Sequence, residues 1–241
     1  MFTYNLKKIK IFTDGANLDS IITLAKDDFI DGITTNPTLM RKSGVTNYMI
    51  FAKSAVKAAK GKSISLEVFS DNFTEMVDQA KILSNLGNSI YVKIPITNTK
   101  GELTGDVVKE LLREGIKVNV TAILTKKQID YCLNLFDKNS FGYISIFSGR
   151  IADTGKDPTL LISYAFSEIK KKDLKNIEII WASTREIYNL YQAAESNCHI
   201  ITIPPDILKK VKLFNYDLEK LSLETVRMFK DDAEKSNFMI Y

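Results

Sequence analysis

The sequence predicts an α/β fold in which one domain forms a single eight-stranded β/α (TIM) barrel. The chain has 241 residues, of which 45% are hydrophobic, and such a barrel uses roughly 250 residues. Eight short apolar or β-branched runs recur at intervals of roughly 20 to 35 residues, the length of a strand plus a covering helix. Alternating strands and helices give a parallel sheet. Eight such units favour closure into a barrel.

The predicted strands follow one another along the whole chain. They fall at residues 9–14, 32–36, 64–69, 90–95, 117–123, 143–148, 177–183 and 199–204. The segments between them are expected to be helices. In 73–86 and 105–114, apolar residues recur three and four positions apart, with a possible cap at Asp71 or Asn72 before the first segment and Gly115 after the second. An open doubly wound sheet is the alternative, but its usual G-x-G-x-x-G phosphate turn is absent from the sequence.

One domain is expected to span residues 1–241, since no Pro-, Gly- or Ser-rich linker divides the chain. Residues 216–241 are predicted to form a C-terminal helical tail. The tail is amphipathic because charged residues separate its apolar positions, Leu218, Leu221, Val226 and Phe229. By itself, this pattern predicts that the tail covers the end of its own barrel.

Composition argues against several classes of partner and site. A net charge of +4 is too weak to indicate nucleic-acid binding, and the lysine runs at 170–172 and 209–210 are expected to be solvated helix ends. His199 is the only histidine, which disfavours a His/Cys metal site and leaves His199 as the only base for a Ser-His-Asp triad. We therefore expect no metal and no nucleic-acid partner.

The same reasoning predicts the compartment. Cys132 and Cys198 are the only cysteines and form no disulfide framework, so a reducing cytoplasm is expected. Residues 1–12 lack the long apolar stretch and small-residue cleavage site of a signal peptide. No run approaches the ~18 apolar residues that cross a bilayer, so no membrane association is expected.

Polar side chains gather near the carboxyl end of nearly every predicted strand. In a barrel these ends form the active-site face, and residues two apart on a strand point to the same side. The residues concerned are Asp14, Thr34, Asn36, Glu67, Lys93, Asn119, Thr121, Ser145, Phe147 and Ser183. We expect their side chains to converge at the mouth of the barrel.

Lys93 indicates the chemistry of the predicted site. It lies in the apolar strand Ile90–Pro95, and a strand of a parallel sheet is covered on both faces. Burial disfavours the charged ammonium, and a neutral amine can form a Schiff base with a carbonyl. The alternative is a lysine whose charged end reaches solvent from the strand end. The expected convergence with Asp14, Glu67 and Thr121 favours the nucleophile.

Other predicted groups complement this amine. Asp14 and Glu67 can act as acid and base. Arg150 and Arg185 follow the sixth and seventh predicted strands. One guanidinium group can bind two oxygens of a phosphate at once, so arginines on adjacent loops indicate a phosphate site.

These residues resemble the transaldolase family in its short-chain form, the subgroup that contains fructose-6-phosphate aldolase. The resemblance covers residues 10 to about 210. Its most specific segment is 32–40 (GITTNPTLM), and 92–95 (VKIP) is similar to the Schiff-base lysine motif. Further segments match in order at 119–121, 145–150, 182–185 and 203–205.

The resemblance implies a transaldolase that uses neither metal nor organic cofactor and acts on sugar phosphates. Lys93 would form the Schiff base, Asp14 would take the proton from the hydroxyl next to the broken bond, and Glu67 with Thr121 would hold a proton-relaying water. Thr34 and Phe147 would also lie at the substrate. The implied donor-hydroxyl ligands are Asn36, Asn119 and Ser145, and the implied phosphate ligands are Arg150, Ser183 and Arg185. The implied reaction converts sedoheptulose 7-phosphate and glyceraldehyde 3-phosphate into erythrose 4-phosphate and fructose 6-phosphate.

Several positions bear on which relative the chain resembles. Fructose-6-phosphate aldolase carries glutamine where Glu67 stands and tyrosine where Phe147 stands, which favours transfer over aldol cleavage. Gly15 replaces a residue that is usually small and hydroxylated. Trp181 is expected to point into the barrel, two residues before Ser183, and Glu186 to compete with phosphate for Arg185. A fructose-6-phosphate aldolase-like enzyme, a divergent member acting on another sugar and a non-catalytic sugar-phosphate-binding barrel are the alternatives.

The resemblance also bears on assembly. In short transaldolases the tail that corresponds to residues 216–241 reaches a neighbouring subunit. A homo-oligomer, pentameric or decameric, is therefore expected.

Overall fold

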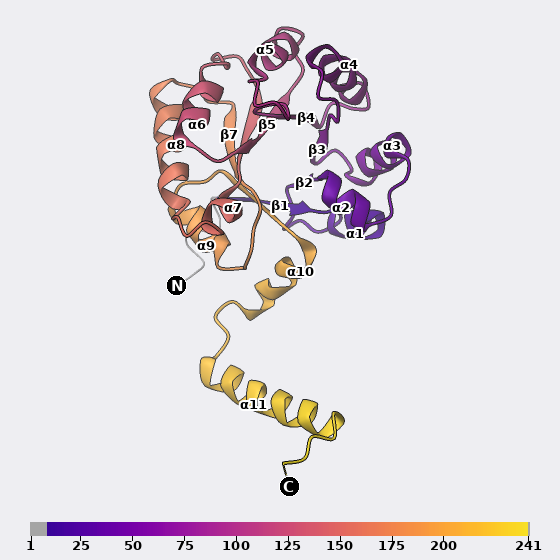
Figure 1. Ribbon diagram of the computed structural model, residues 1–241, viewed down its shortest axis with the longest axis vertical. Coiled ribbons are helices and arrows are strands. Elements are labelled where there is room, and N and C mark those ends of the chain that lie inside the picture. The colour runs from indigo at the N-terminus through magenta and orange to yellow at the C-terminus, as the bar shows by residue number, and fades with distance from the viewer. Residues whose placement is uncertain (1–8, 241) are drawn as a thin grey trace.

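The computed structural model describes residues 9–240 and has the predicted barrel. Figure 1 shows the ring of strands surrounded by helices, with a C-terminal helix beyond the ring. The prediction that residues 1–12 are not a signal peptide rests mostly on residues 1–8, and these lie outside the described residues. Tyr241, at the end of the predicted tail, also lies outside them.

All eight strands occur where the sequence predicts them. They are β1 (Lys10–Asp14), β2 (Gly32–Thr34), β3 (Ser63–Glu67), β4 (Ile90–Pro95), β5 (Val118–Ile123), β6 (Gly142–Ile146), β7 (Ile177–Trp181) and β8 (Ile200–Ile203). Each strand pairs in parallel with the next, and β8 pairs with β1 to close the barrel. The open doubly wound sheet is therefore wrong.

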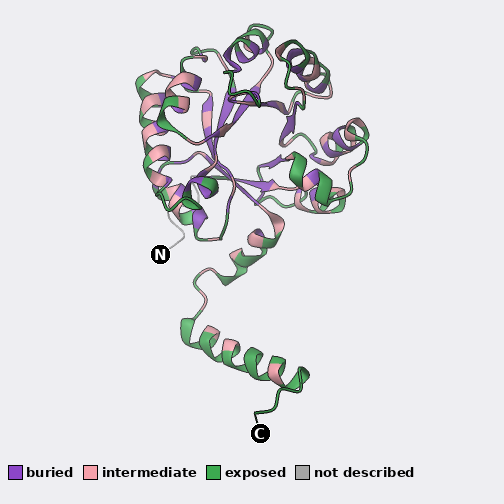
Figure 2. Cartoon of the chain, viewed as in Figure 1, coloured by how far each residue is buried: buried purple, intermediate pink, exposed green. Residues whose placement is uncertain are grey.

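Helices cover the outside of the barrel, with their buried sides facing the strands (Figure 2). The predicted helices at 73–86 and 105–114 correspond to α4 and α5. The helices are α1 (Leu18–Leu24), α2 (Pro37–Lys42), α3 (Tyr48–Ala58), α4 (Phe73–Ser84), α5 (Gly105–Arg113), α6 (Lys126–Leu133), α7 (Ser148–Ala152), α8 (Thr159–Lys171), α9 (Asn189–Glu195), α10 (Pro205–Leu208), the 3₁₀ helix η2 (Lys209–Leu213) and α11 (Leu218–Lys235).

Alternation along the strands sorts the core into two parts. Residues that point outward form a large apolar layer between strands and helices. A small cluster that includes Phe12, Tyr143 and Ile180 fills the inside of the barrel. The ring of Phe12 occupies the space beside Gly32, where an added Cβ would lie 2.6 Å from the ring. Apolar side chains thus fill one end of the barrel interior, and the polar side chains lie towards the carboxyl ends of the strands.

The expected inward orientation of Trp181 is wrong. Trp181 is 1% exposed and belongs to the outer apolar layer, whereas Ile180 and Ala182 belong to the inner cluster. Ser183, just beyond β7, has a φ of 67°, a left-handed conformation that interrupts the alternation of side chains. Counting back two residues from Ser183 therefore selects the wrong face, and the indole does not narrow the cavity.

Helix α11 lies where the tail was predicted, but it does not cover its own barrel. It extends away from the ring of strands (Figure 1) and contains no buried residue. Most of its apolar residues are exposed, including Leu218 at 78% and Phe229 at 63%. Among residues 9–240, no helix is both long and apolar enough to cross a membrane.

Candidate active site

A cavity of about 480 Å³ opens at the carboxyl ends of the strands. Every site residue proposed from the sequence lines it except Asn119. Those that line it are Asp14, Thr34, Asn36, Glu67, Lys93, Thr121, Ser145, Phe147, Arg150, Ser183 and Arg185. A larger cavity of about 670 Å³ lies outside the barrel, between α1 and the segment of α10 and η2, and contains none of these residues. The barrel therefore brings the predicted groups to one place.

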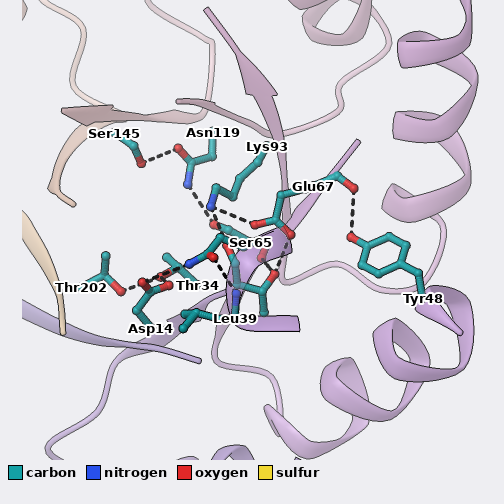
Figure 3. Close-up of polar contacts among 12 residues, drawn as sticks. Asp14, Thr34, Leu39, Tyr48, Ser65, Glu67, Lys93, Asn119, Ser145 and Thr202 are labelled. Carbon is teal, nitrogen blue, oxygen red and sulfur yellow. Dashed lines mark hydrogen bonds and ion pairs between the residues drawn. The ribbon is translucent and has the colours of Figure 1, made fainter. Parts of the chain in front are cut away.

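Lys93 and Glu67 form an ion pair near the floor of the cavity (Figure 3). They are opposite each other in the register of β4 and β3, and both point inward. Lys93 Nζ donates to Glu67 Oε1 at 2.9 Å and to the carbonyl of Thr35 at 2.6 Å. The two side chains are only 9% and 7% exposed. Lys93 is thus buried and does not reach bulk solvent.

Two residues that the sequence analysis did not select hold Glu67. The hydroxyl of Thr35 lies 2.8 Å from Glu67 Oε2, and the hydroxyl of Tyr48 donates to the Glu67 carbonyl at 2.9 Å. Burial raises the pKa of Tyr48 well above its usual value, so Tyr48 stays a donor. Alternation excluded Thr35, which lies between the inward residues Thr34 and Asn36. Nothing in the sequence relates Tyr48, on α3, to β3.

Hydroxyl and amide groups hold Asp14 in place. Thr34 Oγ1 donates to Oδ1 at 2.8 Å, and Asn36 Nδ2 donates to Oδ2 at 3.3 Å. The hydroxyl of Thr202 lies 2.5 Å from that of Thr34. Because the single proton of Thr34 goes to Asp14, Thr202 is the donor to Thr34. Thr202, on β8, was not selected from the sequence.

Burial raises the pKa of Asp14, and the positive charge of Lys93 and the hydrogen bond from Thr34 oppose that rise only in part. A carboxyl group whose pKa moves towards the working pH can both take up and release a proton. Asp14 therefore has the environment of an acid–base group.

Asn119 lies beneath the cavity and does not line it. It is fully buried, accepts a hydrogen bond from Ser145 Oγ at 2.7 Å and donates to Ser65 Oγ at 3.0 Å. Figure 3 shows Ser145 and Asn119 joined in this way, close to Lys93. The expected direct contact between Asn119 and a ligand therefore has no support from the cavity, and Asn119 orients Ser145 instead.

Thr121 Oγ1 is buried and has no hydrogen-bond partner among residues 9–240. The register between β5 and β6 shifts between Val120 and Ile123, and Ala122 has a φ of 62°. This irregularity lies directly after Thr121, which lines the cavity. Buried hydroxyls are nearly always satisfied by protein or water, so this one suits an ordered water or a ligand atom.

The two arginines differ in their partners. The side chain of Arg150, on α7, makes no hydrogen bond within residues 9–240, and its guanidinium lies 5.9 Å from the ring centre of Phe147. Arg185 binds Asp153, with Nη2 2.6 Å from Oδ2 and Nε 3.1 Å from Oδ1. The expectation that Glu186 competes for Arg185 is therefore wrong, because the carboxylate that contacts Arg185 is that of Asp153.

The arrangement combines one amine, two carboxylates, several hydroxyls and two guanidinium groups in one cavity. Among residues 9–240, no group of three or more His, Cys, Asp or Glu side chains is arranged to hold a metal ion. A buried amine beside acid–base groups suits reactions of carbonyl compounds.

Residues 11–240 match the family model described as Transaldolase/Fructose-6-phosphate aldolase. The chain belongs to this family. A Nitrosopumilus maritimus protein named "Probable transaldolase" is 36% identical over 227 residues, covering 94% of this chain and 96% of that protein. A Methanococcus maripaludis protein of the same name is 34% identical over 216 residues, covering 90% and 94%. Membership indicates an enzyme with aldolase-type chemistry.

Solved structures with low sequence identity share the fold. The structure of 2,3-dimethylmalate lyase has a TM-score of 0.52 and 11% identity, covering 98% of this chain and 87% of that one. At this identity the likeness concerns the barrel alone.

Replacement of Asp14 by Asn is expected to stabilise the protein at pH 7. Because burial raises the pKa of Asp14 above the ordinary value of 3.8, folding favours the neutral carboxyl. That stabilisation is complete below the unfolded pKa and is lost as the pH rises through the folded pKa. Asparagine is always neutral, so the expected gain in the free energy of unfolding at pH 7 is on the order of 1 kcal/mol.

Urea unfolding at pH 7 and pH 4 measures this gain. The gain should shrink as the pH falls from 7 to 4, because burial raises the pKa of Asp14 and Asp14 is then protonated more readily than an ordinary carboxyl. Asp28→Asn, at an exposed turn, is the matched control and should change little. A loss of stability at pH 7, or a gain independent of pH, would contradict the assigned environment of Asp14.

Proposed function

We propose that this protein is a transaldolase that transfers a three-carbon dihydroxyacetone unit between sugar phosphates through a Schiff base on Lys93. The observation that carries the proposal is the buried amine of Lys93, 2.9 Å from Glu67 Oε1 in a cavity that also holds Asp14 and two arginines. Membership of the family supports the reaction class.

In the proposed first step, Lys93 passes a proton to Glu67, and its neutral amine then attacks the carbonyl carbon of a ketose phosphate. The carbinolamine must then lose water, so its hydroxyl needs a proton. Glu67 contacts the amine directly, and the hydroxyl of Thr121, which has no hydrogen-bond partner in the described part of the chain, lines the same cavity. We propose that these two groups hold a water molecule, which carries protons between the amine and the carbinolamine hydroxyl.

In the proposed second step, Asp14 takes the proton from the hydroxyl adjacent to the bond that breaks, on the carbon that becomes the aldehyde of the leaving aldose phosphate. That bond cleaves, an aldose phosphate leaves, and the electron pair stays on the dihydroxyacetone unit as an enamine. The enamine then attacks the aldehyde of a second aldose phosphate, and Asp14 returns the proton. Water finally hydrolyses the new Schiff base, which releases the ketose phosphate and regenerates the amine of Lys93. The raised pKa of Asp14 suits a group that works in both directions.

The remaining groups of the cavity are proposed to contact the substrate. We assign the donor hydroxyls to Asn36 and Ser145, with Asn119 orienting Ser145, and the phosphate to Arg150, Ser183 and Arg185. The proposed reaction is that of sedoheptulose 7-phosphate with glyceraldehyde 3-phosphate. The proposal keeps the cytoplasm as the compartment, which suits the free, buried thiols of Cys132 and Cys198.

Borohydride reduction in the presence of fructose 6-phosphate should trap the Schiff base on Lys93. Reduction makes the bond between lysine and sugar permanent, so the mass of the intact protein should increase, and peptide mapping should place the increase on Lys93. Lys93→Met should give no adduct and lose transferase activity by at least about a thousandfold. Lys100→Ala, at an exposed lysine, should behave as the wild type. No adduct on the wild type would support a non-catalytic sugar-phosphate-binding barrel instead.

Transfer is expected to be faster than formation of fructose 6-phosphate from free dihydroxyacetone. Phe147 lines the cavity and has no hydroxyl with which to protonate the enamine, so the enamine waits for an acceptor aldehyde. Both rates are measured with glyceraldehyde 3-phosphate as the acceptor and the same enzyme preparation. Equal rates would indicate a fructose-6-phosphate aldolase-like enzyme.

We also propose a homo-oligomer, a pentamer or decamer, in which α11 packs on a second copy of the chain. The exposed apolar residues of α11 include Leu218, Val226 and Phe229, and such faces are usually covered in solution. The cavity beside α1 is lined in part by apolar Phe29, Leu208 and Val211, which offers a surface for such packing.

Light scattering on the full chain should give a multiple of the monomer mass. Phe229→Asp places a charge on the apolar face of α11 and should shift the protein towards smaller species. Lys230→Ala, next to it on the exposed surface, should not. A monomeric full chain would refute the assembly but leave the proposed chemistry untouched.

A further inference from the structure

Asp153 lies where the loops that carry the two arginines meet. It directly follows α7, three residues after Arg150, and its carboxylate binds Arg185 from the loop after β7. Asp153 itself does not line the cavity, whereas both arginines do. Its contacts therefore reach the cavity only through another side chain.

The carboxylate takes one edge of the Arg185 guanidinium. Nε lies 3.1 Å from Oδ1 and Nη2 lies 2.6 Å from Oδ2, which is a side-on pair. The guanidinium has five N–H donors in a planar fork. Nη1 and the second hydrogen of Nη2 form the end-on edge, and Nη1 makes no hydrogen bond within residues 9–240. A phosphate group can therefore bind this edge without displacing Asp153.

The backbone around Asp153 is held firmly against the loop after β7. Gly149 N donates to the carbonyl of Ala182 at 3.3 Å. A Cβ at Gly149 would lie 1.7 Å from the carbonyl oxygen of Ser183, so only glycine permits this approach. The short helix α7 and the segment that carries Arg185 thus keep a fixed separation.

Both arginines act on the charge of Asp153. The hydrogen bond from Arg185 lowers the pKa of Asp153 most, and the positive charge of Arg150 contributes. Asp153 therefore stays ionised at neutral pH and lies within the field of both arginines, although about half of its side chain is exposed.

We propose that Asp153 is a positioning residue for the phosphate group of the substrate. It holds Arg185 by the side-on edge, so that the end-on edge and the guanidinium of Arg150 bind one phosphate together. A free arginine side chain loses rotamer entropy when it binds a ligand, and a guanidinium that is already held loses less. The inference rests on the proposed function only in taking a phosphorylated ligand for this cavity.

Asp153→Ala tests the inference by equilibrium binding and by kinetics. Calorimetric titration with inorganic phosphate should show a dissociation constant raised about three- to tenfold, because an exposed pair of this kind contributes modestly. Asp153→Asn keeps an oxygen that accepts from Nε and should show a smaller increase. Glu186→Gln removes a neighbouring negative charge that does not contact Arg185, and it should bind as the wild type.

Kinetics separate positioning from a general structural effect. With Asp153→Ala, the KM for glyceraldehyde 3-phosphate should rise by a similar factor and kcat should change little. The kcat/KM for unphosphorylated glyceraldehyde should stay the same. Equal losses with both acceptors would overturn the inference. Tighter phosphate binding by Asp153→Ala or Asp153→Asn would also overturn it, because Asp153 would then compete with phosphate.

The binding arm keeps this inference distinct from the proposed reaction. If the wild type binds phosphate and Asp153→Ala weakens that binding, the inference holds even if no transfer occurs. If the wild type transfers the three-carbon unit but binds no phosphate, the inference fails and the proposed reaction stands.

Discussion

The ion pair between Lys93 and Glu67 is the interaction on which the rest of the site depends. Both side chains are nearly inaccessible to water, and removing two charges from water is costly unless each finds further partners. The carbonyl of Thr35 accepts from Lys93, and the hydroxyl of Thr35 lies against Glu67. Breaking one member of such a pair typically costs about 3–5 kcal/mol. The polar layer is therefore stable only when its support is complete.

The residues that support this ion pair differ in how far the sequence predicts them. The strands, the closed barrel and most of the polar residues at the strand ends follow from spacing and alternation, because those rules act along one strand. Contacts between elements do not follow from them. Tyr48 on α3 and Asp153 after α7 act through a tertiary contact, and no local pattern marks either.

Alternation itself fails where the backbone leaves the extended region. Trp181 was placed on the wrong face because Ser183 adopts a left-handed conformation, and Ala122 does the same after Thr121. A non-glycine residue in this conformation costs roughly 1–2 kcal/mol. Both positions lie beside the cavity, where the surrounding structure imposes the conformation. Asn119 shows a second limit of prediction from alternation. Alternation correctly predicts that its side chain points into the barrel, but not how deep the side chain lies, and this depth determines whether it can contact a ligand.

Helix α7 carries Arg150 and is directly followed by Asp153, while Lys93, Glu67 and Asp14 belong to the strands of the other half of the barrel. In the proposed function, therefore, the residues after β6 that bind the phosphate and the residues that break the carbon–carbon bond lie in separate stretches of the sequence. If the proposed function is correct, sequence changes confined to the short segment after β6 would alter which end group the substrate must carry and leave Lys93 unchanged. This separation would let the substrate range of such a barrel change while its reaction stays the same.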